Sequence, residues 1–187
     1  MTTTQATSVL KKNKQRGFSN VQIAIGILVG VIALIGSLSG FQFINQAKVN
    51  NEITALTDLK SSTMRYGQFV PTFTGNVSLD TLNEQNFFNS TGFTYVGGTT
   101  PSLTNQWGGA VTIAAGTAAV AGDAIDFTFA NVPAAACKEL VTKVDNIASK
   151  ITIGTTVFDR TVAIATKIAN AKTVCTGNVS MVYTISK

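Results

Sequence analysis

The fold is decided close to the N-terminus by residues 16–47, which read RGFSNVQIAIGILVGVIALIGSLSGFQFINQA. Charged residues are absent between Gly17 and Ala47, whereas a group of basic residues stands directly before this interval. These are Lys11, Lys12, Lys14 and Arg16. A basic flank ahead of more than about 18 apolar residues is typical of a helix that inserts into a membrane with its N-terminus in the cytoplasm. An ordinary secretory signal has an apolar region of about 7–15 residues, so this run is too long for one.

A processing signal stands ahead of the apolar run, at Gly17-Phe18. A short basic leader that ends in Gly, followed by Phe or Met and a long apolar helix, resembles the N-terminus of a type IV prepilin. The resemblance implies that residues 1–17 are a leader, that a prepilin peptidase cuts after Gly17, and that the new amine of Phe18 is methylated. Gln22 departs from the family pattern, which usually has Glu at that place.

Phe18 to about Phe69 predicts one long helix with two different halves. Residues 18–47 are apolar all round, as expected in lipid or in the middle of a helix bundle. The second half is amphipathic, and its apolar residues recur at helical spacing. They are Val49, Ile53, Leu56 and Leu59, with Lys48, Asn51, Glu52, Asp58 and Lys60 expected elsewhere around the helix. Pro71 marks the latest end of the helix, because the residue before a proline disfavours helical geometry.

Three residues of the apolar half are candidates for contacts between subunits. Gly26 and Gly30 have the spacing that lets two membrane helices approach closely, although glycine is common in membrane helices for other reasons. The resemblance to pilins implies that Gln22 faces the N-terminal amine of a neighbouring subunit. Gln can accept a hydrogen bond from that amine, but it cannot neutralise its charge.

Length and charge limit the protein to one domain plus a membrane segment. The chain has 187 residues and a formal net charge of +5, and four of its 14 basic residues lie in the leader. A chain that begins at Phe18 therefore has ten basic residues against nine acidic ones, a net charge of about +1. This balance gives no argument for nucleic acid as a ligand. We expect residues 48–187 to form a globular extracellular domain.

The chain has two cysteines, Cys137 and Cys175, and no histidine. An even number of cysteines in an exported chain favours a disulfide, and two free buried thiols are the alternative. This composition cannot supply a structural zinc site or a histidine-based nucleophilic site. Asp123 and Asp126 are close in sequence, but they lie beside a predicted turn, where Asp is favoured for turn chemistry. We therefore expect no enzyme activity, no catalytic residue, no metal and no cofactor.

Between Pro71 and Thr104 the chain is rich in Gly, Thr, Asn and Ser, and we expect a long exposed connection there. One short helix is predicted within it, at Ser78–Phe88. Ser78 is the expected cap of this helix, and a capping box that begins at Thr81 is a competing start.

The C-terminal half predicts a hairpin, two helices and further strands. Gly122-Asp123 supplies a turn between the strands Val111–Ala115 and Ala124–Asn131. Val132-Pro133 opens a helix with the proline at its first position. The later elements are a short strand or extended segment at Lys150–Phe158, a segment at Thr161–Thr173 that fits a helix slightly better than a strand, and an interior strand at Asn178–Ser186. In the first helix, Cys137, Leu140, Val141 and Val144 share a face. In the segment Thr161–Thr173, the residues whose spacing favours a helix are Val162, Ala165, Ile168, Ala169 and Lys172.

Three blocks of this half resemble the type IVb pilins, the branch that includes the toxin-coregulated, bundle-forming and conjugative thin-pilus major pilins. The blocks are Asn105–Thr112, Phe129–Leu140 and Cys175–Gly177. The resemblance implies an α+β type IV pilin fold, in which a long N-terminal helix with a protruding apolar half packs on an antiparallel sheet. It also implies a disulfide-bounded C-terminal region. Phe18 is a departure, because type IVb members more often begin with Met, Leu or another apolar residue.

The leading hypothesis is a structural subunit of an extracellular type IV pilus. Its expected partners are copies of itself in a helical filament, the prepilin peptidase, the pilus assembly machinery and, before assembly, the bacterial inner membrane. A second hypothesis is a minor pilin or pseudopilin that acts at the tip, in assembly or in secretion. A third is a signal-anchored surface domain that never polymerises and is not cut at Gly17.

Overall fold

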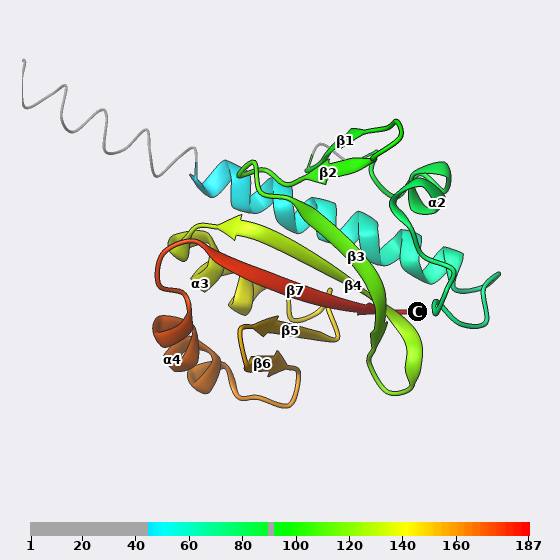
Figure 1. Cartoon of the computed structure of the whole chain (residues 1–187). Helices are drawn as coiled ribbons and strands as arrows, with labels where there is room; N and C mark the ends of the chain where they lie inside the picture. Colours follow the sequence, from blue (N-terminus) through cyan, green and yellow to red (C-terminus); the bar gives the residue numbers. More distant parts are fainter. Residues whose placement is uncertain (1–44, 90–91) are drawn as a thin grey trace, which may run out of the picture. The chain divides into compact units, whose positions relative to one another are not determined.

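The computed structural model describes residues 45–89 and 92–187, which lie within one unit of the chain, Gln42–Lys187 (Figure 1). The elements after the long helix are α2 (Leu79–Glu84), β1 (Thr94–Val96), β2 (Ser102–Thr104), β3 (Val111–Thr117), β4 (Ala121–Val132), α3 (Ala134–Lys143), β5 (Lys150–Ile153), β6 (Thr156–Asp159), α4 (Ile164–Val174) and β7 (Val179–Ser186). The predicted leader and nearly all of the predicted apolar half, residues 18–47, lie outside the described residues.

The long helix is described from residue 45 to residue 66 and ends there, before Pro71, as predicted. Val49, Leu56 and Leu59 of the predicted stripe are buried, and Ile53 packs partly buried against the core. Across residues 45–89 and 92–187, no helix has both the length and the apolar character needed to cross a membrane.

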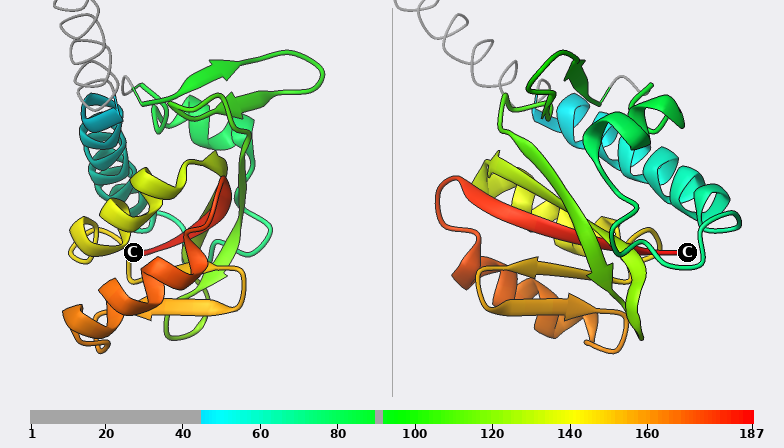
Figure 2. Two further views of the ribbon diagram at one scale, coloured as in Figure 1. Left: turned by 90° about the vertical axis from the view of Figure 1, so that its left-hand side faces the viewer. Right: turned by 45° about the vertical axis from the view of Figure 1, so that its right-hand side comes forward.

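An antiparallel five-stranded sheet with the order β3-β4-β7-β5-β6 supports the long helix. β7 lies between β4 and β5, which confirms the prediction of an interior strand at the C-terminus. The predicted hairpin is confirmed as β3 and β4, with Val111 opposite Phe129 and Ile113 opposite Phe127. In Figure 2 the long helix, α3 and α4 lie on the same face of this sheet.

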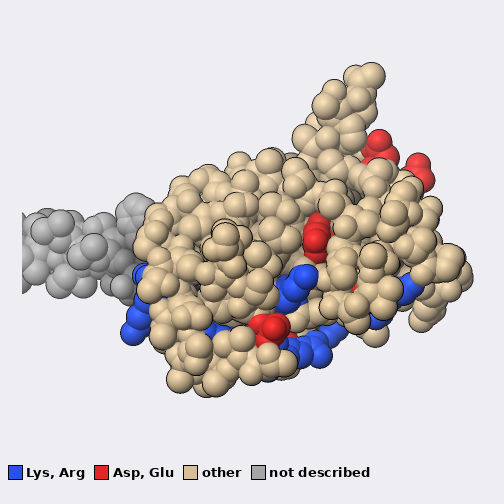
Figure 3. Space-filling model, turned by 60° about the horizontal axis from the view of Figure 1, so that its bottom comes forward, with Lys and Arg blue, Asp and Glu red and all other residues tan. Residues whose placement is uncertain are grey.

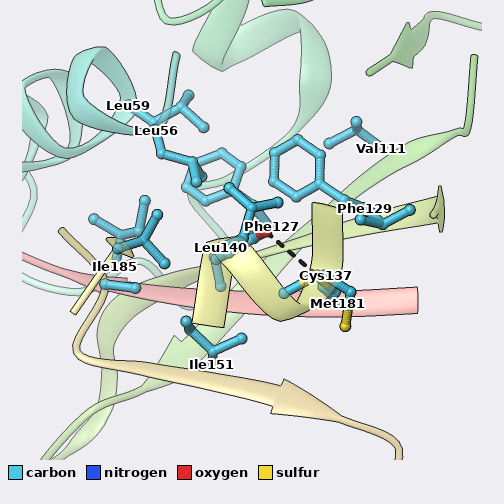
Figure 4. Close-up of a cluster of buried hydrophobic side chains, with 14 of the residues drawn as sticks. Leu56, Leu59, Val111, Phe127, Phe129, Cys137, Leu140, Ile151, Met181 and Ile185 are labelled. Carbon is cyan, nitrogen blue, oxygen red and sulfur yellow. Dashed lines mark hydrogen bonds between the residues drawn. The ribbon is translucent and has the colours of Figure 1, made fainter. Parts of the chain in front are cut away.

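Apolar side chains on that face form the core. Alternate residues of β4 are completely buried, namely Ile125, Phe127 and Phe129, because successive strand residues point to opposite faces. The same alternation buries Met181, Tyr183 and Ile185 of β7. Figure 4 shows Leu56 and Leu59 of the long helix gathered with Phe127, Phe129 and Leu140. The helix is therefore held on the sheet by burial of its apolar stripe, the dominant favourable term in folding.

The connection between the long helix and β3 is not the exposed segment that its composition predicts. It adds fully buried side chains to the core: Phe73, Leu82 and Phe87, with Leu103 nearly so. The ring of Phe73 stacks on Tyr66 of the long helix, with ring centroids 5.9 Å apart. β1 and β2 form a small antiparallel pair that sequence did not reveal. Each is only three residues long, too short to show an alternating pattern.

Three predicted boundaries need correction. The short helix begins as predicted at the cap Ser78, whose side chain accepts a hydrogen bond from the Thr81 amide, but it ends at Glu84 rather than Phe88. Asn86 follows with a φ of 60°, a left-handed conformation that cannot continue the helix. Pro133 is the N-cap of α3, one place before the first helical position. The single extended segment predicted at Lys150–Phe158 is a hairpin of two strands, β5 and β6.

The segment Thr161–Thr173 forms a helix, as favoured, but the face that it buries does not follow the spacing of its apolar residues. In α4 the buried residues are Lys167 and Ala171, whereas Ile164 and Ile168 are exposed. Lys167 lies inward because its ammonium group forms an ion pair with the carboxylate of Asp145, in the segment after α3.

Candidate functional site: the helix–sheet interface and the disulfide-bounded region

The residues predicted to take part in processing and subunit contact are not among those the structure describes. They are Gly17, Phe18, Gln22, Gly26 and Gly30. Their roles remain predictions. The other predicted site, the cysteine pair, is in the described part of the chain and can be examined directly, together with the interface where the long helix meets the sheet.

Glu52 lies in the middle of the buried stripe of the long helix, where sequence analysis did not expect it. The side chain is 0% exposed, and neither carboxyl oxygen has a hydrogen-bond partner among the described residues. Its position could have been inferred, because residues three or four apart share a helix face and Glu52 stands at those spacings from Val49 and Leu56. Because Glu52 is charged, it was expected on the polar side of the helix instead.

Burial determines the ionisation of Glu52. Desolvation raises the pKa of its carboxyl group from 4.5 to about 8, because the charged form loses its hydration without a compensating partner. The carboxyl group of Glu52 also affects the pKa of the Tyr183 hydroxyl in β7. Its pKa lies well above the usual value, first through its own burial and then through the negative charge of Glu52. At neutral pH the fold therefore favours a neutral, protonated Glu52.

The predicted disulfide is present between Cys137 in α3 and Cys175, which caps the C-terminus of α4. The two Cα atoms are 5.8 Å apart, within the range that a disulfide spans. Cys175 stands just ahead of β7, so the bond joins the start of this central strand to α3. The closed loop contains β5, β6 and α4, and it is the disulfide-bounded C-terminal region expected for this fold.

A buried ion pair lies within the same region. Nζ of Lys167 in α4 bonds to Oδ1 of Asp145, in the turn that follows α3. The side chain of Lys167 is 1% exposed and that of Asp145 is 37% exposed. A buried ammonium group is tolerated only with such a partner, so this pair fixes the rotation of α4. The i,i+3 and i,i+4 apolar spacing of α4 gave no signal for it.

The first block of resemblance forms a tight turn between β2 and β3. The buried side chain of Asn105 accepts hydrogen bonds from the amides of Trp107 and Gly109 through Oδ1, at 3.0 and 2.9 Å. Its amide donates to the carbonyl of Ala130 in β4 at 2.7 Å. A Cβ at Gly109 would stand 1.9 Å from the same carbonyl oxygen, so only glycine fits. The block is therefore a structural feature that fastens the turn to the sheet.

The turn between β3 and β4 comprises residues 118–120, so Gly122-Asp123 lies within β4 and is not the turn that the sequence predicts. The carboxylate of Asp123 supports this turn from the start of β4. It accepts hydrogen bonds from the amides of Ala118, Ala119 and Val120. Desolvation acts to raise the pKa of Asp123, but these backbone bonds outweigh it and hold the pKa below the usual value. Asp126 points to a different partner and accepts a hydrogen bond from the hydroxyl of Thr184. The two acids therefore have separate structural tasks.

Charged side chains are few and of both signs on the face shown in Figure 3. Within residues 45–89 and 92–187, no group of three His, Cys, Asp or Glu side chains could hold a metal ion. The notable features of the described part are thus a helix–sheet interface, a disulfide and an ion pair, all of which hold the fold together.

Comparison with known proteins gives a family and a fold. The family model described as PilS N terminal matches residues 39–186. Among solved structures, the chain is similar to a type IV b pilin from Salmonella typhi, with 21% sequence identity and a TM-score of 0.57. The similarity covers 74% of this chain and 99% of that one. No curated protein matches the sequence.

The two comparisons agree with the architecture described above. The family match includes the amphipathic part of the long helix, the whole sheet and both cysteines. The structural match extends over almost the entire pilin structure, which shows that the helix-on-sheet arrangement is shared despite the low identity. The chain belongs to the PilS family and has the fold of a type IVb pilin.

Proposed function

We propose that the protein is a structural subunit of a type IVb pilus. It is inserted in the bacterial inner membrane as a prepilin, cut after Gly17 by the prepilin peptidase, and methylated on the Phe18 amine. The pilus assembly machinery then polymerises it with copies of itself into an extracellular helical filament. Adhesion, aggregation and conjugation are the tasks such a filament could perform.

One observation carries the proposal. The amphipathic half of the long helix buries its apolar stripe against the sheet of its own domain, whereas the preceding half is apolar on all sides and needs an apolar environment outside that domain. Val49, Leu56 and Leu59 are buried against the sheet. Residues 18–43 include no charged side chain and are apolar or small almost throughout. Such a segment needs lipid before assembly and the helices of other subunits afterwards. The same apolar helix therefore anchors the precursor in the membrane and forms the core of the filament.

The disulfide-bounded region supports an extracellular destination. Disulfides persist in the oxidising compartments outside the cytoplasm. The Cys137–Cys175 bond joins two helices and the central strand of the domain. A pilin that leaves the cell gains from such a bond, because it remains folded without access to chaperones.

Processing can be tested by replacing Gly17 with a bulky residue in the bacterium that produces the pilus. The precursor should then remain uncut and membrane-bound, and filaments should be lost. Replacing Gly97, a loop glycine outside the leader whose Cβ would make only an ordinary contact with Tyr95, with the same bulky residue tests for unspecific effects on production. Normal filaments from the Gly17 variant would show that the cut does not occur there.

A minor pilin or pseudopilin is the second candidate, and Gln22 is the observation that favours it. In the pilin family the Glu at this place is thought to pair with the amine of a neighbouring subunit, and some minor pilins and pseudopilins lack it. A major subunit makes up most of the protein in sheared filaments, whereas a minor one is a trace component. The abundance of this chain in sheared filaments therefore separates the two candidates.

A further inference from the structure

Phe69 is the most exposed large apolar side chain of the described residues, at 79%. It follows the end of the long helix at residue 66, in a turn whose backbone is well bonded. The amide of Phe69 donates to the carbonyl of Tyr66, and that of Val70 donates to the same oxygen. The phenyl ring is thus held out from the domain by an ordered turn, where it presents an apolar surface that a contact with another chain would bury.

A hollow of about 420 Å³ opens at another place on the domain, beside the β5–β6 turn. Its lining has no charged side chain and comprises Ile153, Gly154, Thr155, Thr156, Val174, Val179 and Ser180. A cavity of about 150 Å³ with apolar walls can hold benzene, so this hollow has room for a phenyl ring. The lining combines three aliphatic side chains, Ile153, Val174 and Val179, with three small hydroxyl residues, Thr155, Thr156 and Ser180.

Phe69 and the hollow lie at opposite ends of the central strand. Val179 and Ser180, at the start of β7, line the hollow. Beyond the other end of β7, Lys187 reaches the turn of Phe69, where its ammonium donates to the carbonyl of Pro71 at 2.5 Å. Seven steps along a strand span about 24 Å. Figure 1 shows the long helix and β7 ending at the same side, with the β5–β6 turn at the opposite side.

We propose that Phe69 of one subunit inserts into the Ile153–Val174–Val179 hollow of the next copy of this chain. Two different, complementary surfaces at opposite ends of a molecule make a head-to-tail contact, which continues indefinitely unless a rotation closes it into a ring. A filament requires this kind of contact. The inference rests on the proposed function, and it adds a contact between globular domains to the one expected between apolar helices.

Truncation of Phe69 tests the contact in the full chain, produced in the pilus-forming bacterium. Removing an aromatic anchor from a contact between subunits should reduce the recovery of sheared filaments about tenfold at equal subunit level. The change is Phe69→Ala. Val120→Ala is the matched control, because Val120 is 68% exposed at the same end of the domain and lies outside the proposed contact. The control should give filaments at the parental level.

A second measurement locates the partner surface. A photoreactive benzophenone analogue of phenylalanine is placed at Phe69, assembled filaments are irradiated, and the linked peptides are identified by mass spectrometry. The expected product links two copies, through a peptide that contains residues 153–156 or 174–180. A link to another segment, the absence of a link between copies, or full filament recovery with Phe69→Ala refutes the contact alone. Failure of the unaltered chain to enter filaments overturns both this inference and the proposed function.

Discussion

Glu52→Gln should stabilise the protein at neutral pH, which is the reverse of the usual effect of altering a buried residue. Glu52 is 0% exposed and has no hydrogen-bond partner among the described residues. Its pKa is raised from 4.5 to about 8 in the folded protein. Gln has nearly the same shape but does not ionise, so the substitution removes the titration and leaves the packing in place.

The sign and size of the effect follow from linkage. An acid whose pKa is raised by folding binds its proton more tightly in the folded state than in the unfolded state. The protein therefore has the full contribution of Glu52 protonation to its free energy of unfolding below pH 4.5, and loses it as the pH rises toward about 8. Each pH unit in this window removes about 1.4 kcal/mol. Between pH 4.5 and pH 7 the wild-type protein therefore loses about 3 kcal/mol, and Glu52→Gln recovers that amount at pH 7.

Urea unfolding of the full chain in detergent provides the assay, with the fluorescence of the sole tryptophan, Trp107, as the probe. The free energy of unfolding is compared between pH 5 and pH 8 for the wild type, Glu52→Gln and the control Asp58→Asn. Asp58 is exposed on the same helix, so its variant should keep the wild-type slope. A wild-type stability that does not fall between pH 5 and pH 8, or an undiminished slope in Glu52→Gln, would refute the reasoning.

Further expectations concern the disulfide, the ion pair and Gln22. Cys137→Ser should cost about 4 kcal/mol for a loop of this length, and the subunit should be degraded or fail to assemble, as measured by its cellular level and filament recovery. Asp145→Asn should lower the free energy of unfolding by about 2 kcal/mol, because Lys167 would stay buried without its acid, whereas Lys167→Met should be close to neutral. Gln22→Glu should keep or improve assembly if the amine of a neighbouring Phe18 is near and charged. Loss of filaments in Gln22→Glu with intact filaments in Gln22→Ala would show that the amine is elsewhere.

The sequence predicts most of the architecture because its strongest signals are periodic. The spacing of Val49, Leu56 and Leu59 identifies the helix face that packs on the sheet, and the alternation of Met181, Tyr183 and Ile185 identifies the central strand. Both patterns are long enough to stand out from composition. The disulfide is also predictable without knowledge of the tertiary contacts, because the prediction depends on the even number of cysteines and on export to an oxidising compartment.

The failures occur where a distant partner decides which side chain is buried, or where residue type conceals the burial that position implies. Lys167 faces inward because Asp145 receives its ammonium group, and no local pattern in α4 records that partner. Glu52 is buried although it is charged, and only its spacing within the apolar stripe marked it. Phe73 enters the core from a segment whose composition suggested an exposed connection.

The central claim is that the chain is cut after Gly17, loses its leader and is assembled into a pilus. The most direct measurement is the intact mass of this protein in filaments sheared from the cell surface. We expect a chain that begins at Phe18, with one methyl group on its amine and an intact disulfide. A chain in those filaments that still carries residues 1–17, or filaments that do not contain the chain at all, would contradict it.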